Sequence, residues 1–302
     1  MILAALAIAA AKPAFAATHA PQPAPYPSDT SPEMRVATTG YRLAVRNLDH
    51  CPRKAPQLGL LLHELGSYDN DKRDWARATF GLGTGIGVLG VVPGSAAADA
   101  GLAPGDEIIA LAGASVQAGA APLASPRASY DRVEAFVSAL KARLQVGAAA
   151  LVVRHGTRER TVELPTRLGC AAEFSMMPQS DLDAWSDQRY VAVTRGLAQV
   201  APDDELAFVM AHELAHIALG HGDKGRGLLI GLGIGSRGAR QRERDADRLG
   251  LTMTRAAGYS AAGAEGLLMR LAHASGPHIS LTHPSFRSRI EAIKTAQTAE
   301  PK

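Results

Sequence analysis

Two histidines and one glutamate in the segment 203–220 have the types and spacing of a metal site. The segment reads DDELAFVMAHELAHIALG: acidic residues come first and strong helix formers continue up to Gly220, which predicts a helix. His212 and His216 then lie one turn apart on one face, where both imidazoles can reach a single ion. Glu213 lies on the neighbouring face, beside a water that the ion would hold. This is the H-E-x-x-H arrangement.

The ligands that this spacing offers favour one Zn²⁺ per chain. Imidazole and carboxylate ligands with one open coordination position are typical of a catalytic zinc site, where the ion lowers the pKa of its bound water to about 7. Glu213 is then expected to take a proton from that water during its attack and to pass it to a leaving amine. The predicted chemistry is the hydrolysis of a peptide bond, with Glu213 as the general base.

The third protein ligand of such a site must come from elsewhere in the chain. The extended pattern that adds a third histidine needs glycine and histidine where this sequence has Leu219 and Gly222. The segment ARQRERDADRLGLTMTRAAGY (239–259) predicts a second helix, on which Glu243 and Asp247 are again at i and i+4. Glu243 can therefore complete the metal site.

Two interpretations of Asp247 fit the residues equally well. A carboxylate outside the ligand set can fix the tautomer of a ligand histidine and raise its basicity. Alternatively, Asp247 belongs to a solvated helix face and pairs with Arg244 or Arg248. The spacing alone does not decide between them.

Three motifs together resemble the zinc metallopeptidase family of HtpX, BepA and the CAAX prenyl protease Ste-twenty-four. They are HELAH, then ERDAD with the following RLG and AGY, and finally THPSFRSRI, within about residues 184–292. The resemblance implies zinc ligation by His212, His216 and Glu243, and base catalysis by Glu213. It also matches Asp247 to the acidic residue that closes the second motif.

The last motif implies two further residues near the active site. His283 and Arg289 match a family histidine, which approaches the zinc or polarises the substrate, and a family arginine, which binds a substrate carbonyl. The alternative for His283 is a residue at the start of a helix, before Pro284. His221 follows His216 by five residues, off the ligand face, and is interpreted as an ordinary surface histidine.

Upstream of the HELAH motif, Tyr190, Val191, Ala192 and Val193 resemble the family's edge strand. A short strand bounded by polar residues can accept a substrate segment in extended form, which would place the scissile carbonyl near the zinc. The sequence departs from the family at Asp183, where asparagine is usual. We therefore expect residues 190–193 to be the substrate strand.

Residues 80–165 have a different texture and resemble a bacterial PDZ domain. The resemblance rests on PGSAAADAGLAPGDEIIALAGASV, on a following helix with apolar residues at helical spacing, and on a terminal hairpin. It implies capture of an extended peptide or chain terminus along the strand near Gly85 to Val92, with the glycine-rich turn at Gly81 to Gly85 facing the terminal carboxylate. The alternative is a packing or regulatory domain with a closed groove.

The rest of the chain completes the predicted organisation. An apolar run ending in Ala14-Phe15-Ala16 resembles a secretory signal (residues 1–16), and a proline-rich leader follows (17–32). Residues 33–79 are then the N-terminal part of the peptidase unit, and 166–302 the zinc metallopeptidase domain. The insert 222–240 is expected to be a mobile flap or a loop that touches a membrane.

Charge and cysteine content bear on partners and compartment. The net charge of +3 comes without any block of lysine or arginine, so we expect no nucleic-acid partner. Export to the periplasm or outside the cell is expected from the signal, with a membrane tether as the alternative. Cys51 and Cys170 bracket the PDZ-like segment, and a disulfide there is a hypothesis, with two buried thiols as the alternative.

These observations predict an α+β protein with two units. One is a mainly helical, gluzincin-type metallopeptidase domain with a small edge-exposed sheet, and the other is an inserted small β domain of the PDZ type. The expected function is zinc-dependent cleavage of misfolded or unassembled envelope proteins, captured by the PDZ-like unit. The alternative is a zinc-binding, gated or weakly active adaptor that binds peptides. The substrate preference and the oligomeric state are left open.

Overall fold

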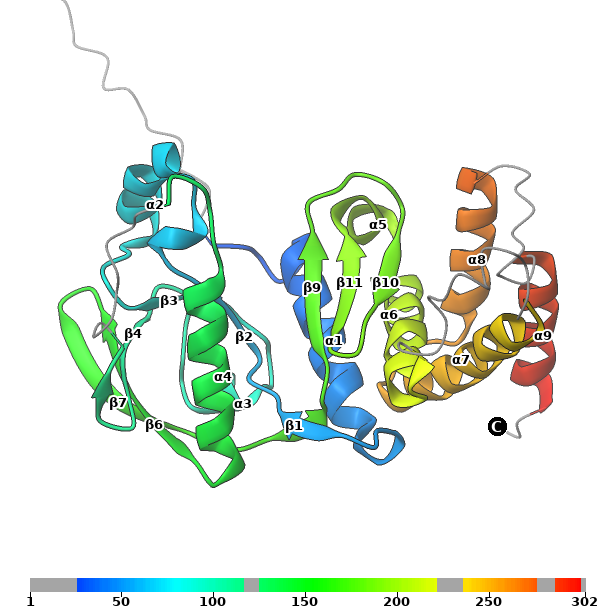
Figure 1. The fold of residues 1–302 in the computed structure, drawn as a ribbon, viewed down its shortest axis with the longest axis horizontal. Helices are drawn as coiled ribbons and strands as arrows, with labels where there is room; N and C mark the ends of the chain where they lie inside the picture. Colours follow the sequence, from blue (N-terminus) through cyan, green and yellow to red (C-terminus); the bar gives the residue numbers. More distant parts are fainter. Residues whose placement is uncertain (1–25, 117–124, 222–235, 276–285, 300–302) are drawn as a thin grey trace, which may run out of the picture.

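The computed structural model describes residues 26–116, 125–221, 236–275 and 286–299, and within them the fold is mixed α+β, as predicted. A β unit lies on one side and a group of helices on the other, with helix α1 and a small sheet between them (Figure 1). The predicted signal, the flap residues 222–235 and His283 lie outside the described residues.

Helix α1 (Pro32–Arg46) begins inside the predicted leader. Ser31 caps it, because its side chain accepts a hydrogen bond from the backbone N–H of Met34, and a proline occupies its first turn. Tyr26 also has a defined place, with its ring centroid 5.6 Å from that of Phe80. The predicted proline-rich leader (17–32) therefore overlaps the start of this helix, because local capping by Ser31 begins the helix at Pro32.

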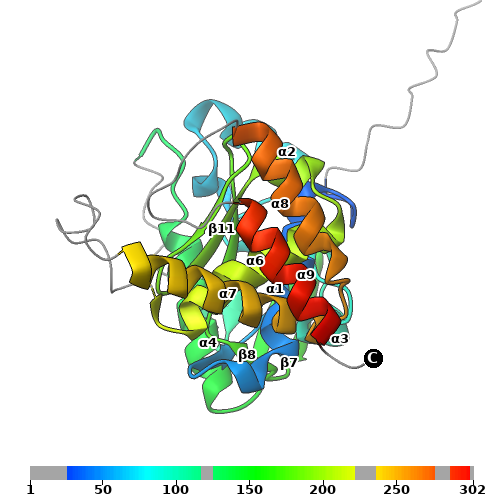
Figure 2. The same ribbon diagram turned by 90° about the vertical axis from the view of Figure 1, so that its right-hand side faces the viewer.

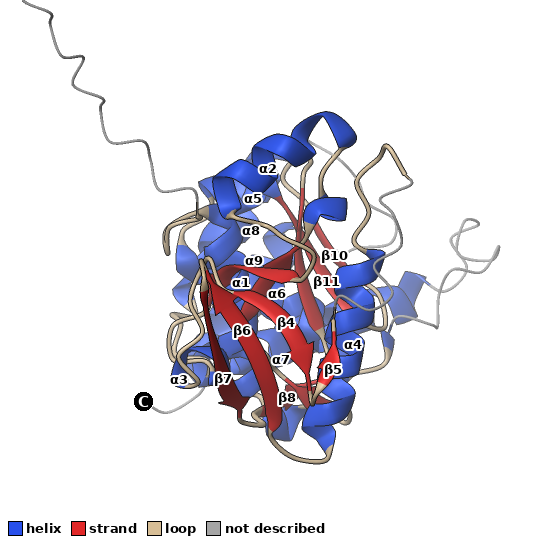
Figure 3. Cartoon of the chain, turned by 90° about the vertical axis from the view of Figure 1, so that its left-hand side faces the viewer, coloured by secondary structure: helices blue, strands red, loops and turns tan. Residues whose placement is uncertain are grey.

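The β unit is built on an antiparallel sheet with strand order β2-β3-β4-β6-β7, and β5 pairs with β4. Figure 3 labels strands β4 to β7 of this sheet. Helices α3 and α4 cover it, and a separate hydrophobic core forms around Ile86, Ile108, Leu140 and Leu151. The strands are β2 (Leu60–His63), β3 (Ile86–Val91), β4 (Glu107–Leu111), β5 (Ala114–Ser115), β6 (Ala149–His155) and β7 (Arg158–Leu164). The helices are η2 (Leu65–Ser67), η3 (Asn70–Lys72), α2 (Arg73–Phe80), α3 (Ala96–Asp99) and α4 (Asp131–Gln145).

Strand β2 changes two of the predictions. It pairs antiparallel with β3, so the β unit begins near Leu58 and the predicted boundary at residue 80 lies inside it. Strand β3 pairs with β2 from Gly87 to Val91 and with β4 at Ile86 and Gly87, so β2 already occupies the edge at which peptide addition was expected. No other described strand covers the outer edge of β2, which is the edge available for pairing on this side of the sheet.

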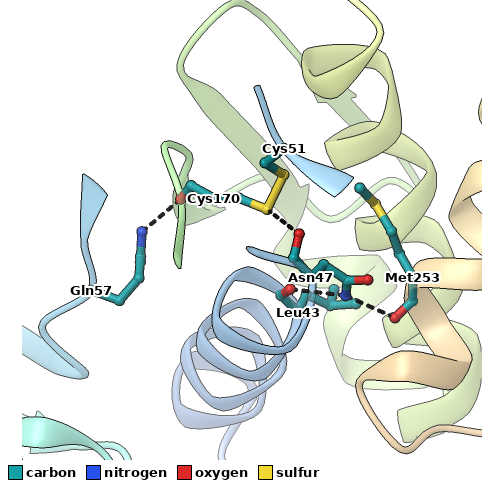
Figure 4. The surroundings of a disulfide bond; sticks show 6 residues. All are labelled: Leu43, Asn47, Cys51, Gln57, Cys170 and Met253. Atoms are coloured by element: carbon teal, nitrogen blue, oxygen red, sulfur yellow. Dashed lines mark hydrogen bonds between the residues drawn. A yellow bond between two sulfur atoms is a disulfide. The ribbon is translucent and has the colours of Figure 1, made fainter. Parts of the chain in front are cut away.

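The two chain segments that connect the β unit to the rest of the protein lie side by side. Strand β1 (Lys54–Pro56), which follows η1 (Leu48–His50), pairs antiparallel with β8 (Leu168–Cys170). Cys51 and Cys170 form a disulfide with a Cα–Cα distance of 5.3 Å, so the hypothesis is confirmed in the structure (Figure 4). Both cysteines belong to the buried core of the helical unit. The disulfide therefore ties together the two ends of the β unit at its base.

The helical unit combines α1 with a three-stranded sheet and the C-terminal helices (Figures 1 and 2). Its core includes Leu197, Leu206, Phe208 and Met210, all fully buried. The strands are β9 (Glu173–Met177), β10 (Ala184–Ser186) and β11 (Tyr190–Thr194). The helices are α5 (Arg195–Val200), α6 (Asp203–Ala218), α7 (Ser236–Ala256), α8 (Ala262–Ser275) and α9 (Phe286–Ala299). Among the described residues, no helix has both the length and the apolar character of a bilayer span.

The order of the small sheet corrects the predicted substrate strand. Strand β11, which holds Tyr190, Val191, Ala192 and Val193, is central: it pairs antiparallel with β10 and parallel with β9. Its backbone groups are therefore already used, and a substrate cannot pair with it. The edge strand beside α6 is β10, residues 184–186 (Figure 1). The error arose because β10 is too short to show an alternating pattern in the sequence.

The end of β2 makes the stability of the fold sensitive to acid. His63 is buried, with its Nδ1 2.7 Å from the Tyr68 hydroxyl, and burial lowers the pKa of His63 to about 4. The unfolded chain binds this proton near pH 6.5, so it binds more protons than the folded protein between pH 6.5 and about 4. The free energy of unfolding should therefore fall as the pH is lowered through this window.

We expect the proton uptake of His63 on unfolding to lower the free energy of unfolding by about 2 kcal/mol between pH 7 and pH 4.5. Urea unfolding of wild type and His63→Gln at both pH values measures it, since the variant should lose less stability on acidification. The same change at the exposed His50 is the control and should retain the wild-type loss. An equal loss in wild type and His63→Gln would contradict the prediction.

Candidate metal centre and active site

The site is built on the contact between α6 and α7, which cross at its floor (Figure 2). Helix α6 has three acidic residues in its first turn, which suit the helix N-terminus, and it is buried along most of its length. Helix α7 can approach closely because Gly250 faces α6: a Cβ there would lie 3.0 Å from the Cα of His212. This close approach brings the residues of the second motif against the H-E-x-x-H turn.

Three side chains converge as the sequence predicted. The ligand atoms of His212, His216 and Glu243 all lie within 4.8 Å of one another. The two histidine Nε2 atoms are 3.1 Å apart, and each lies 3.6 Å from a carboxylate oxygen of Glu243. Two imidazoles and one carboxylate, with side chains only 8%, 17% and 10% exposed, fit a divalent metal of the zinc type.

Asp247 holds one of these histidines in place. Its Oδ1 lies 3.0 Å from Nδ1 of His212, and Arg289 donates to both of its carboxylate oxygens at 2.9 and 2.6 Å. Arg244 and Arg248 are exposed on the other side of α7, so the solvated-face interpretation is wrong. With Nδ1 directed at a carboxylate, His212 presents the lone pair of Nε2 to the metal position.

Burial and charge set the ionisation of this group. Burial, and next the adjacent His212, lower the pKa of His216 to about 3, so the imidazole is neutral and able to bind a metal. Burial alone would raise the pKa of Asp247. Its contacts with His212 and Arg289 outweigh this effect and lower that pKa to about 2. Asp247 is therefore an anion that can pair with the guanidinium of Arg289 and with Nδ1 of His212.

Glu213 lies next to the ligands on α6, where a general base is needed. Burial raises the pKa of its carboxyl group, which makes it a stronger base than an exposed glutamate. Ser186, at the end of β10, donates a hydrogen bond of 2.6 Å to Oε2 of Glu213. The edge strand and the general base are thus in direct contact.

His221 is not an ordinary surface residue. Its Nδ1 lies 3.0 Å from Nδ1 of His216, and it is half-buried beside the site. Each ligand histidine therefore has a partner at Nδ1, Asp247 for His212 and His221 for His216. The spacing rule missed this contact because residue 221 lies past the end of α6, after Gly220 turns the chain at φ 67°.

Removing this partner should weaken metal binding. We expect His221→Ala to lower the affinity for zinc about 10- to 100-fold, because His216 loses the group that orients its ring. Competition with a chelating dye measures the affinity directly, and the exposed His273→Ala is a matched control. A zinc affinity unchanged in His221→Ala would show that the contact has no role in holding His216.

The profile of peptidase family M48 matches residues 162–226 and 228–297 of the chain. The matched residues contain the metal ligands, Glu213 and Asp247 that the geometry has brought together. The protein is a metalloprotease. It is a hydrolase that acts on peptide bonds, and its chemistry depends on a metal. The three side chains that could hold this metal lie on α6 and α7, inside the matched region.

Other comparisons are less informative for the metalloprotease. A crystal structure of the HtrA3 PDZ domain bound to a phage-derived ligand (FGRWV) is similar at 16% identity, over 38% of this chain and 89% of that one. Its TM-score is 0.28, so the likeness carries no argument here. No protein of curated function matches the chain.

Arg289 lies in the site, as predicted. Its guanidinium is only 11% exposed and donates the paired hydrogen bonds to Asp247, so it positions that carboxylate, and its contact with a substrate carbonyl stays a prediction. Ser186 was missed by sequence reasoning. Its only signal in the sequence was its position just before the turn into β11. That position does not show which strand lies beside the metal site.

Proposed function

We propose that the protein is an exported zinc endopeptidase that cleaves unfolded or unassembled proteins. The observation that carries this proposal is the convergence of His212, His216 and Glu243 within 4.8 Å, with Glu213 beside them. The disulfide between Cys51 and Cys170 supports export, because such bonds persist in oxidising compartments. The match to peptidase family M48 supports the reaction class.

The protein's own residues divide the chemistry between them. His212, His216 and Glu243 would hold the zinc, which supplies Lewis acidity and an acidified water. Glu213 takes the proton from the attacking water on its carboxylate and delivers it to the leaving amine. Ser186 holds Oε2 of Glu213, and Asp247 keeps Nε2 of His212 directed at the metal position.

An extended substrate segment would bind along β10. This strand is short, its edge beside α6 is paired with no other described strand, and it ends at Ser186, so a segment paired with it passes next to Glu213. Folded proteins do not offer such a segment, which is why the substrates are unfolded chains. The outer edge of β2 offers a second place where an extended segment can be captured before cleavage.

Hydrolysis of casein by the purified protein tests this function. We expect cleavage in the presence of zinc, loss of cleavage after treatment with a chelator, and recovery when zinc is restored. Zinc bound at one ion per chain without cleavage of casein would favour a gated adaptor instead. Failure to bind zinc would contradict the proposed metal site itself.

A further inference from the structure

Strand β10 carries one large aromatic side chain beside the active site. Trp185, its middle residue, is 38% exposed. Ser186 points towards α6, where it contacts Glu213, and Ala184 packs against the core of the helical unit. Because neighbouring side chains of a strand point to opposite faces, Trp185 lies on the other face of the small sheet. It is therefore one residue away from the contact with the general base and partly open to solvent.

The hydrogen bonds of β10 show which of its backbone groups face the outer edge. At the end of its pairing with β11, the N–H of Asp187 donates to the carbonyl of Tyr190. In an antiparallel pair, residues that exchange hydrogen bonds alternate with residues that do not, so Trp185 directs its backbone groups at β11. Ala184 and Ser186 direct theirs at the outer edge, with which no other strand pairs among the described residues.

One of these outward groups is already occupied. The N–H of Ala184 donates to Oδ1 of Asp183 at 2.9 Å. A substrate segment can therefore pair through the carbonyl of Ala184 and through both backbone groups of Ser186. In an antiparallel arrangement, the substrate residue opposite Trp185 then belongs to a pair without hydrogen bonds, in which the Cα atoms lie about 4.5 Å apart and the side chains are closest.

We propose that Trp185 is a specificity-determining residue, which selects unfolded segments with an aromatic side chain at the position opposite it. The two side chains would share one face of the extended sheet and lie in contact, and aromatic pairs are favourable beyond the apolar area that they bury. The substrate residues on either side of the aromatic one would point to the opposite face, towards Glu213. This inference deepens the substrate class of the proposed function and rests on that function.

The carboxylates around Trp185 favour basic neighbours of the aromatic residue. Asp183 and Asp187 lie two positions before and after Trp185, and both are exposed. Alternation along the strand places them on the same face as Trp185. Opposite charges across a strand pair are stabilising and like charges are destabilising. A segment with lysine two positions before and after its aromatic residue therefore suits this face.

Cleavage of two internally quenched fluorescent peptides by the zinc-loaded, full-length protein tests the proposal. The first peptide is Gly-Ser-Lys-Ala-Phe-Ala-Lys-Ser-Gly, and the second has alanine in place of phenylalanine. We expect kcat/KM of the wild type to be about 10-fold higher for the first peptide. Mass spectrometry of its products should find one cleavage position, because the pairing with Trp185 fixes the register of the segment.

Three variants show whether Trp185 causes this preference. Trp185→Ala should abolish it, whereas Trp185→Phe keeps an aromatic ring and should retain most of it. Trp75→Ala removes an exposed tryptophan of α2, in the β unit, and is the matched control that should leave the preference unchanged. The ratio of the two kcat/KM values is the quantity compared, since a partial loss of folded protein lowers both values equally.

Fluorescence anisotropy measures the same preference without cleavage. The two peptides carry a fluorescein label, and the protein carries Glu213→Gln. We expect the phenylalanine peptide to bind about 10-fold more tightly, and Trp185→Ala added to this background should remove the difference.

Equal kcat/KM values for the two peptides in wild type, or a preference that survives in Trp185→Ala, would overturn the proposal. Casein hydrolysis is measured on the same preparations. A protein that cleaves casein without preferring the phenylalanine peptide keeps its proposed function and loses this inference. A preference in binding without any hydrolysis of casein or peptide would contradict the proposed function and support the role of Trp185.

Discussion

Replacing Glu213 by glutamine is expected to lower the rate of casein hydrolysis about 10²- to 10⁴-fold while zinc stays bound. The amide has almost the shape of the carboxylate but cannot take a proton from water. The substitution leaves the expected zinc ligands, His212, His216 and Glu243, in place, so the geometry of the metal site should not change. Hydrolysis rates and zinc content, measured on the same preparations, separate loss of the base from loss of the metal.

Two further variants make this result specific. Ser186→Ala removes the hydrogen bond to Oε2 of Glu213 but leaves the carboxylate, so a smaller loss of rate is expected. Glu265→Gln removes a carboxylate on α8 that pairs with Lys294, and it should leave the rate unchanged. If Glu213→Gln retained the wild-type rate with zinc bound, the carboxylate beside the metal would not be the base.

Loss of the disulfide should have the largest effect on stability. We expect replacement of both Cys51 and Cys170 by alanine to lower the free energy of unfolding by about 2–5 kcal/mol. The bond closes a loop with a sequence separation of 119 residues, so its removal frees a large part of the unfolded chain. Urea unfolding of the oxidised wild type and of the double variant, followed by circular dichroism, measures the difference.

Reduced wild type is the control for this experiment, because it keeps both side chains and loses only the bond. Its free energy of unfolding should match that of the double variant, apart from the small effect of the two Cys→Ala substitutions. Metal binding should survive in both, since neither cysteine touches the site residues. An oxidised protein no more stable than its reduced form would show that the crossing strands β1 and β8 already hold the units together.

The metal site was predictable because its chemistry is local in the sequence. His212, Glu213 and His216 lie within two turns of one helix, so their types and spacing define the site once the helix forms. Glu243 and Asp247 have the same relation on α7. Resemblance to a family was needed only to join the two helices and to choose between the interpretations of Asp247.

Two of the predictions that failed concern edges of sheets. The sequence marks Tyr190–Thr194 and Ile86–Val91 as strands, and both are strands in the structure. Each turned out to be paired on both sides, by β10 and β9 in one case and by β2 and β4 in the other. Alternation along a segment reports which side chains are buried. It carries no information on whether a neighbouring strand occupies the backbone.

What this sequence indicated by itself is therefore the reaction, through a candidate zinc ligand set with an adjacent base, whereas the bond between its two cysteines was left as a hypothesis. Only the tertiary structure decided that β10 and β2 lie at edges of their sheets among the described strands, and that His221 and Ser186 contact the site residues. The physical reason is distance along the chain. Helical spacing is fixed by the backbone over a few residues, whereas these contacts join side chains and strands whose approach depends on how the whole chain packs.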